Sequence, residues 1–267
     1  PTEAAVFPGE VQSDGASQHS YISYDTSRID SAVEAAKRAD CTVLVVGDLS
    51  GLFLAGTVGE GSDTTSLRLP GVQPELLNAL LDTGKPVVVV VSSGRPYNLE
   101  RGFSDASAVL QVWLPGEEGA AAIVDVLYGS VNPGGKLPVS IPKCAGALPY
   151  FYNHKLKSAG TPIQHHFGAA YPFGFGLSYT EFALTDFDVT PATLDFHREL
   201  SVSCTVTNVG MRTGDQVVQV YVRDLFASLT RPVMELKGYR RVRLEPGQGV
   251  RVRFGLSVDL FSFTDAG

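Results

Sequence analysis

The sequence has few cysteines and no arrangement of residues typical of a metal site. Its three cysteines, Cys41, Cys144 and Cys204, are odd in number and far apart, so neither a disulfide framework nor a cysteine-bound metal is predicted. We expect Cys41 and Cys204 to be small buried side chains of strands. The pair His165-His166 is not expected to bind a metal either, because adjacent residues of an extended chain point to opposite sides.

Blocks of basic residues and long apolar runs are also missing. The formal net charge is −7, and without a cluster of Lys or Arg we expect neither nucleic acid nor an anionic membrane surface as a partner. The strongest apolar run, residues 86–91, is too short to cross a bilayer. Gly47 and Gly51 do not form a Gly-x-Gly-x-x-Gly fingerprint, so a dinucleotide is not expected, and no cofactor is predicted.

What the chain does have is enough apolar material for a sizeable core. It has 267 residues, of which 44% are hydrophobic and 18% are charged, which fits one large domain or two ordinary ones. No basic segment followed by an apolar one marks a signal peptide at its start. Because the first residue is Pro1, we expect the chain to be part of a longer protein.

The first half alternates helical and strand-like segments. This alternation predicts a layered α/β domain with a mostly parallel sheet over residues 1–145. We expect Ser27 to cap the first helix, and Val124 and Tyr128 to face inward from the last one. The helices are predicted at 28–39, 72–81 and 117–128, and the strands at 41–46, 86–91 and 108–113. Ligands of such sheets gather beyond the carboxyl ends of the strands.

After residue 182 the pattern changes to strict alternation of apolar and polar residues. Alternation of this kind is typical of half-buried strands, and we expect about six of them in residues 182–267. The sequence therefore predicts an all-β sandwich of the immunoglobulin or fibronectin type III kind, truncated at its end. Residues 146–181, rich in Pro, Gly and aromatic side chains, are predicted to form a connector.

An unusually long loop separates the first predicted strand from the second helix. It contains about two dozen residues, whereas strand-to-helix connections usually have roughly 2–6, and much longer loops tend to be functional or disordered. Within it Glu60 stands between Gly59 and Gly61, which allow the backbone to turn sharply and the carboxylate to point into a cleft. From spacing alone a solvated acidic loop is the favoured interpretation, because exposed Glu is the rule.

The residues around Glu60 resemble the acid/base segment of glycoside hydrolase family 3. Residues 59–63 read Gly-Glu-Gly-Ser-Asp, and residues 67–73 read Leu-x-Leu-Pro-Gly-x-Gln. The family pattern is Glu-Gly-x-Asp-Arg, a spacer, and Leu-Pro-Gly-x-Gln. The resemblance implies that Glu60 is a general acid/base. Thr64 stands where the family usually has Arg, so the charge environment of Glu60 differs from the family pattern.

Further motifs extend the resemblance over nearly the whole chain from about residue 25. They lie at residues 116–119, 132–138, 173–180, 207–210 and 231–236. The family plan is a barrel, then an α/β sandwich, then a fibronectin-like domain, and this chain resembles the second and third parts only. The resemblance also implies that the α/β domain, residues 1–145, is incomplete at its N-terminus, without its first strand and helix. In the family the nucleophile is an Asp of the barrel. We therefore expect the isolated chain, which lacks the N-terminal barrel domain as its partner, to be inactive.

The resemblance implies the C-terminal part of a retaining, exo-acting β-glycosidase, of which a β-glucosidase is the first expectation. The substrate would be a β-glucoside or a β-xyloside, and a β-xylosidase or α-L-arabinofuranosidase remains an alternative. An alternative of another class is a non-catalytic module that binds carbohydrate or protein. Reading the gene upstream of Pro1 for a barrel with a suitable Asp separates these two classes. The resemblance also favours an extracellular or secretory location.

Three other side chains are candidates for contact with substrate. Asp63 is a candidate substrate-binding residue, although an Asp in a loop more often caps the local backbone. Arg95, which follows the second strand, is a second candidate, and a structural role in its Gly-Arg-Pro turn is the competing interpretation. Trp113 closes an apolar strand and is expected to belong to the core rather than to a sugar platform.

Overall fold

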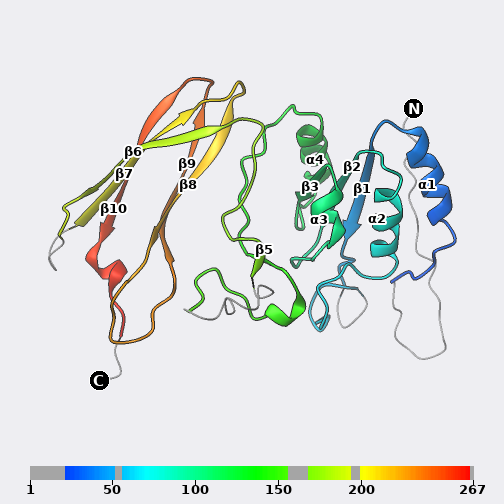
Figure 1. Cartoon of the computed structure of the whole chain (residues 1–267), viewed down its shortest axis with the longest axis horizontal. Helices are drawn as coiled ribbons and strands as arrows, with labels where there is room; N and C mark the ends of the chain where they lie inside the picture. Colours follow the sequence, from blue (N-terminus) through cyan, green and yellow to red (C-terminus); the bar gives the residue numbers. More distant parts are fainter. Residues whose placement is uncertain (1–21, 52–55, 156–167, 194–198, 265–267) are drawn as a thin grey trace. The chain divides into compact units, whose positions relative to one another are not determined.

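The protein consists of two compact units. The structure, a computed structural model, describes residues 22–51, 56–155, 168–193 and 199–264. One unit contains Pro1–Ile123 and Cys144–Gly146, and the other contains Val124–Lys143 and Ala147–Gly267. The first holds a parallel sheet with helices, and the second is largely antiparallel β structure (Figure 1). The predicted fold class is therefore confirmed, while the predicted boundaries at residues 145 and 182 stay predictions.

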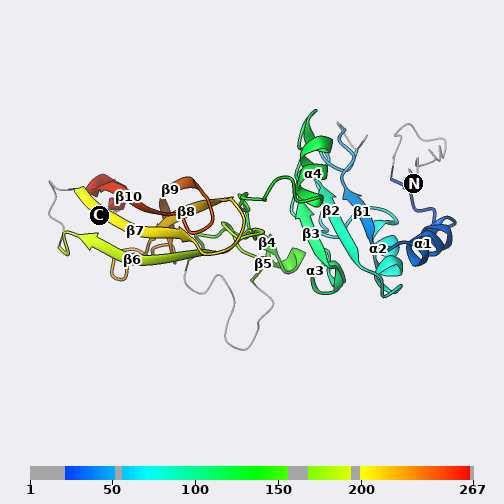
Figure 2. The same ribbon diagram turned by 90° about the horizontal axis from the view of Figure 1, so that it is seen from above.

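The parallel sheet of the first unit has the strand order β1-β2-β3, and its strands lie side by side in Figure 2. The strands are β1 (Thr42–Gly47), β2 (Val87–Ser92) and β3 (Ala108–Gln111). Since all three run in the same direction, their carboxyl ends share one edge. The loop that contains Glu60 begins at that edge, directly after β1.

The helices lie close to the predicted positions, with two local corrections. They are α1 (Ile29–Arg38), α2 (Gln73–Leu81), α3 (Arg101–Asp105), which was not predicted, and α4 (Gly119–Leu127). Ser27 does not cap α1, because its amide and hydroxyl both donate to the Asp25 carboxylate and Arg28 occupies the cap position. Val124 and Tyr128 are exposed rather than inward-facing.

The core of the first unit lies on one face of the sheet, between β1, β2 and the helices α1 and α2. Strand β2 is buried on both faces, as its unbroken apolar run predicts, since Val89 and Val90 are each 0% exposed. On β1 the second face is open, and Val43 and Val45 are 50% and 65% exposed. The buried core residues are Ala36, Leu44, Val46, Leu69, Leu77, Leu80, Leu81, Val87, Val89, Val91, Tyr97 and Leu99.

The second unit is a β-sandwich built from two antiparallel sheets, β10-β7-β6 and β8-β9. Its strands are β6 (Phe182–Thr190), β7 (Glu199–Asn208), β8 (Gly214–Val222), β9 (Glu235–Leu244) and β10 (Gly249–Ser257). The described residues after 181 thus hold five strands, whereas about six were expected. Alternate residues of β7 and β10 face the core, where Cys204 is buried as predicted. Cys41, expected to be buried, is exposed.

Asparagine side chains anchor the turns of the second unit. Asn132 accepts hydrogen bonds from the Ser178 hydroxyl and the Tyr179 amide and donates to the Thr213 carbonyl. The family-like motifs at 132–138 and 173–180 therefore bind each other, which is a structural role. Smaller elements complete this unit and its boundary: β4 (Ile141–Pro142), η1 (Ala145–Ala147), β5 (Ala169–Tyr171) and η2 (Val258–Phe261).

Candidate active site

Glu60 occupies the tip of a tight turn, and its side chain is exposed to solvent. The Ser62 amide donates to the Gly59 carbonyl at 3.1 Å, which closes the turn of residues 59–62, called here the Glu60 turn. Gly59 has φ of +131°, and a Cβ there would lie 2.0 Å from the Gly51 carbonyl oxygen. Only glycine fits that position, so the backbone before Glu60 is fixed by sterics as well as by hydrogen bonds.

The approach to the turn is paired with the segment that follows β1. The Gly51 amide donates to the Val58 carbonyl at 2.9 Å, and the Thr57 amide donates to the Leu49 carbonyl at 2.7 Å. The loop therefore folds back along its own start. Backbone groups that are satisfied in this way give a long connection a defined path.

Arg95 binds the backbone on both sides of Glu60. Its Nη2 donates to the Thr57 carbonyl at 2.9 Å and to the Ser62 carbonyl at 2.7 Å. The side chain comes from the turn directly after β2, and the Ser93 hydroxyl donates to the Arg95 carbonyl at 2.8 Å. A planar guanidinium that joins two carbonyls fixes their separation, so Arg95 keeps the turn in one shape.

Asp48, the first residue after β1, lies at the centre of a second group of hydrogen bonds. Its carboxylate accepts from the Thr57 hydroxyl at 2.7 Å, from the Gly94 amide at 2.9 Å and from the Tyr97 hydroxyl. Burial, followed by the hydrogen bond and the negative charge of Asp48, raises the pKa of the Tyr97 phenol. Tyr97 therefore remains a hydrogen-bond donor at neutral pH.

The Leu-Pro-Gly-x-Gln segment closes the loop against the end of β1. Gln73 accepts from the Gly47 amide at 2.7 Å and donates to the Gly47 carbonyl at 2.9 Å. Leu69 is buried in the core, and the Val72 amide donates to the Ser23 carbonyl. Both ends of the loop thus meet at the carboxyl edge of β1.

A cavity of about 560 Å³ opens beside this loop. Its volume lies in the range of small-molecule sites, roughly 300–1,000 Å³. Asp63 and Thr64 contribute to its wall together with the ring of Tyr97, whereas Glu60 does not line it. Asp63 and Thr64 are both exposed. Asp63, rather than Glu60, therefore lines this cavity.

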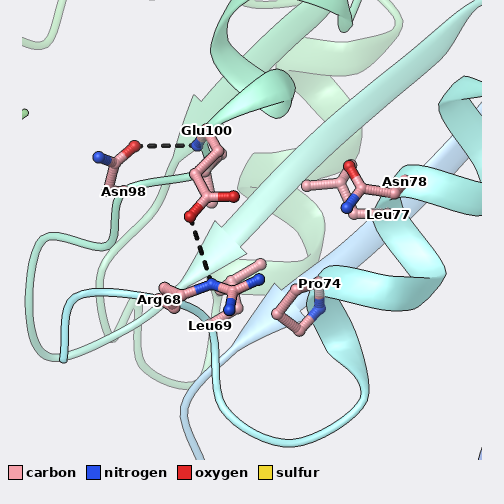
Figure 3. A pocket seen from close by; sticks show the side chains of 8 residues that line it. Arg68, Leu69, Pro74, Leu77, Asn78, Asn98 and Glu100 are labelled. Carbon is pink, nitrogen blue, oxygen red and sulfur yellow. Dashed lines mark hydrogen bonds and ion pairs between the residues drawn. The ribbon is translucent and has the colours of Figure 1, made fainter.

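A second hollow, drawn in Figure 3, is much smaller. It has about 10 Å³, which is room for about one water molecule. Arg68 and Glu100 form an ion pair across it, with Nε and Oε1 3.3 Å apart, and Asn98 accepts from the Glu100 amide. These polar side chains therefore bind one another and the local backbone.

The described ranges hold no candidate for a metal site or a membrane-spanning helix. Among those residues, no three His, Cys, Asp or Glu side chains come together in a way that would hold a metal ion. None of the helices in that same part of the chain has the length and apolar character needed to cross a membrane.

Comparison with known proteins decides the family. Residues 6–179 match the glycosyl hydrolase family 3 C-terminal domain, and residues 216–267 match the fibronectin type III-like domain. The chain belongs to glycoside hydrolase family 3. The resemblance inferred from the motifs is thereby confirmed, and the α/β unit and the β-sandwich are the family 3 C-terminal domain followed by a fibronectin type III-like domain.

The relatives of this family 3 chain include two kinds of glycosidase. It is 40% identical over 248 residues to a periplasmic beta-glucosidase of Salmonella typhimurium, covering 88% of this chain and 32% of the relative. It is also 40% identical over 232 residues to a beta-xylosidase of Formosa agariphila, covering 85% of this chain and 31% of the relative. A solved beta-glucosidase from Listeria innocua in complex with glucose has a TM-score of 0.82 at 32% identity, over 91% of this chain and 34% of that one. The chain therefore spans about a third of the length of these relatives.

The residues singled out in this family 3 sequence lie around one loop. Glu60 is at its tip, Asp63 is on the cavity wall, and Arg95 binds the backbone of the Glu60 turn. Sequence reasoning missed Asp48, whose only signal is its place directly after an apolar strand, and Tyr97, which carries no motif of its own. Trp113 is half-buried, and its carbonyl accepts from the Ser93 amide.

Proposed function

We propose that this chain contributes the general acid/base of a retaining, exo-acting β-glycosidase, with Glu60 in that role. The observation that carries the proposal is the Glu60 turn itself. An exposed carboxylate stands at the ligand edge of a parallel sheet, on a turn that Gly59 and Arg95 hold in one conformation. Preorganised groups of this kind are what proton transfer to a leaving group requires.

The chemistry follows from the two steps of retaining hydrolysis. Glu60 as an acid gives its proton to the glycosidic oxygen while a second carboxylate attacks the anomeric carbon. Glu60 as a base then takes a proton from the water that releases the sugar. The two carboxyl groups need to be roughly 5–5.5 Å apart. We propose that the second one, an Asp, comes from an N-terminal barrel in the full-length protein.

The 267-residue chain by itself is then not expected to turn over a glycoside. General acid assistance alone accelerates a reaction by roughly 10²–10⁴-fold, which is far below enzyme rates. Asp63 is proposed as a substrate contact because it lines the cavity beside the loop. Arg95 was a candidate for the same role, but its Nη2 already serves two carbonyls, so we assign it to support of the turn.

The sugar is proposed to be β-linked glucose, with β-linked xylose as the second candidate. Both kinds of activity are named among the relatives at 40% identity, so both substrates belong in the first assay. Aryl β-glucosides and aryl β-xylosides, tested on the full-length protein, distinguish the two candidates by their kcat/KM values.

The role of Glu60 is tested by Glu60→Gln in the full-length protein. Without an acid, departure of a poor leaving group slows by about 10²–10⁴-fold, while a good leaving group needs little protonation and loses much less. The measurement is kcat/KM for a series of aryl glycosides whose phenols differ in acidity. Asp40→Asn, an exposed carboxylate before the amino end of β1, is the matched control. Equal losses across the series would show that Glu60 is not the acid.

A further inference from the structure

We propose that Asp48 is a positioning residue for Glu60. This inference rests on the proposed function, because it assigns to Asp48 the task of holding the acid/base loop in its working geometry. Asp48 does not belong to the Glu-Gly-x-Asp motif and stands at the start of the loop, 12 residues before Glu60. Its contacts, rather than its sequence context, carry the argument.

Asp48 is itself fixed to the scaffold. Its amide donates to the Ser92 carbonyl at 2.8 Å, which continues the parallel pairing of β1 with β2 by one residue. The preceding residue, Gly47, pairs with both polar atoms of the Gln73 side chain. The Asp48 carboxylate therefore projects from the end of a strand that is hydrogen-bonded on two sides, to β2 and to Gln73.

From that point the carboxylate holds the loop directly. Oδ1 accepts from the Thr57 hydroxyl, and the same hydroxyl oxygen accepts from the Leu49 amide at 2.9 Å. Thr57 lies three residues before Glu60. Hydrogen bonds to an ionised carboxylate are roughly twice as strong as those between neutral groups, so this contact is suited to fixing a loop.

Asp48 also binds the segment directly before Arg95. Oδ2 accepts from the Gly94 amide, and Arg95 follows Gly94 directly. Arg95 in turn binds the carbonyls of Thr57 and Ser62, so Glu60 lies between two held points. One carboxylate thus fixes both the loop and the arginine that braces it. Tyr97, which is buried in the core, donates to the same carboxylate.

The substitution Asp48→Asn removes the hydrogen-bonding role of the carboxylate but keeps nearly the same side-chain volume. Asparagine has nearly the same size but only one side-chain acceptor oxygen, and its NH₂ group cannot accept. Three donors point at position 48, from Thr57, Gly94 and Tyr97. An NH₂ group in place of Oδ2 would face the Gly94 amide, which can only donate, so the Arg95 turn must shift. An NH₂ group in place of Oδ1 forces the Thr57 and Tyr97 hydroxyls to accept instead of donate, and neither orientation keeps the negative charge that strengthens these contacts. A misplacement of about 1 Å can cost about 10²-fold in rate.

The experiment compares Asp48→Asn, Glu60→Gln and the double variant in the full-length protein, with Asp40→Asn as the control. The assay is kcat/KM for aryl β-glycosides with a good and a poor leaving group. We expect Asp48→Asn to lose about ten- to a hundredfold on the poor leaving group and less than about threefold on the good one. Because Asp48 acts through Glu60, Asp48→Asn should cause no further loss once Glu60 is Gln.

Each alternative result has its own meaning. Suppose that Glu60→Gln lowers kcat/KM mainly for the poor leaving group. The role of Glu60 then stands, but the positioning role of Asp48 is overturned by either of two results: an equal loss of kcat/KM on both leaving groups in Asp48→Asn, or losses that multiply in the double variant. If Glu60→Gln itself shows no discrimination, the proposed function fails together with the inference. Thr57→Val, which keeps the carboxylate and removes one donor, is the second variant in case Asp48→Asn does not fold. It should show a smaller loss with the same preference for poor leaving groups, and an even loss would count against Asp48.

Discussion

Gly59 shows how a single residue controls the direction of the proposed acid/base. Gly59→Ala would place a methyl group 2.0 Å from the Gly51 carbonyl oxygen at a φ of +131°. The turn must then move, and we expect kcat/KM of the full-length protein on a poor leaving group to fall by about tenfold or more. Gly135→Ala is the control, since a Cβ there meets no atom within 4 Å. Equal activity of both variants would show that the turn tolerates displacement.

At this scale the sequence predicts a candidate acid/base but not its surroundings. Glu60 could be proposed because its motif is local. Tyr97 and Asp48 are separated by 49 residues, and Gln73 and Gly47 by 26, so only the folded chain brings them together. Local rules also failed where a neighbour competed, because Asp25 takes both the amide and the hydroxyl of Ser27 and leaves α1 without the expected cap.

Among the elements of the second unit, β7 depends on the buried side chain of Asn208. Its Oδ1 accepts from the Thr180 hydroxyl and the Gly210 amide, and its Nδ2 donates to the carbonyls of Arg212 and Leu244. It joins the end of β7 to the end of β9 and to the turn before β8. With all four hydrogen-bonding positions filled, Asn208 links three segments that the two sheets alone do not connect.

Asn208→Ala should therefore weaken this unit. Removing the amide leaves buried donors and acceptors without partners, at about 1–3 kcal/mol for each group that water cannot reach. We expect the free energy of opening of β7 and β10, measured by native-state hydrogen exchange, to fall by at least about 2 kcal/mol. Val209→Ala, at the exposed neighbouring position, should change it by less than about 0.5 kcal/mol. A small effect of Asn208→Ala would mean that water replaces its contacts.

Helices and strands were predicted correctly where the hydrophobic pattern of the sequence was strong. The all-apolar β2 and the alternating β7 and β10 follow directly from the sequence pattern. The short helix α3 was missed because five residues carry too little periodicity. The expected inward face of α4 was wrong, because Val124 and Tyr128 find no cover in the described part of the chain. A pattern predicts that a face is apolar but not which element covers it.

Considered as a whole, the chain combines an α/β unit that carries the proposed acid/base with a fibronectin type III-like β-sandwich. Its length is about a third of that of its relatives. Retaining hydrolysis needs two carboxylates, and we propose Glu60 for one of them. The catalytic centre is then formed in the full-length protein, with Glu60, Arg95 and Asp48 as the proposed contribution of this chain.

Azide rescue of Glu60→Ala in the full-length protein tests the role of Glu60 most directly. With an activated aryl β-glucoside the glycosyl intermediate still forms, but no base activates water to release it. Azide needs no base and fits the space left by the carboxylate. The account predicts that the rate rises with azide concentration and that the product is the β-glycosyl azide. A rate that does not respond to azide, with free sugar as the only product, would contradict it.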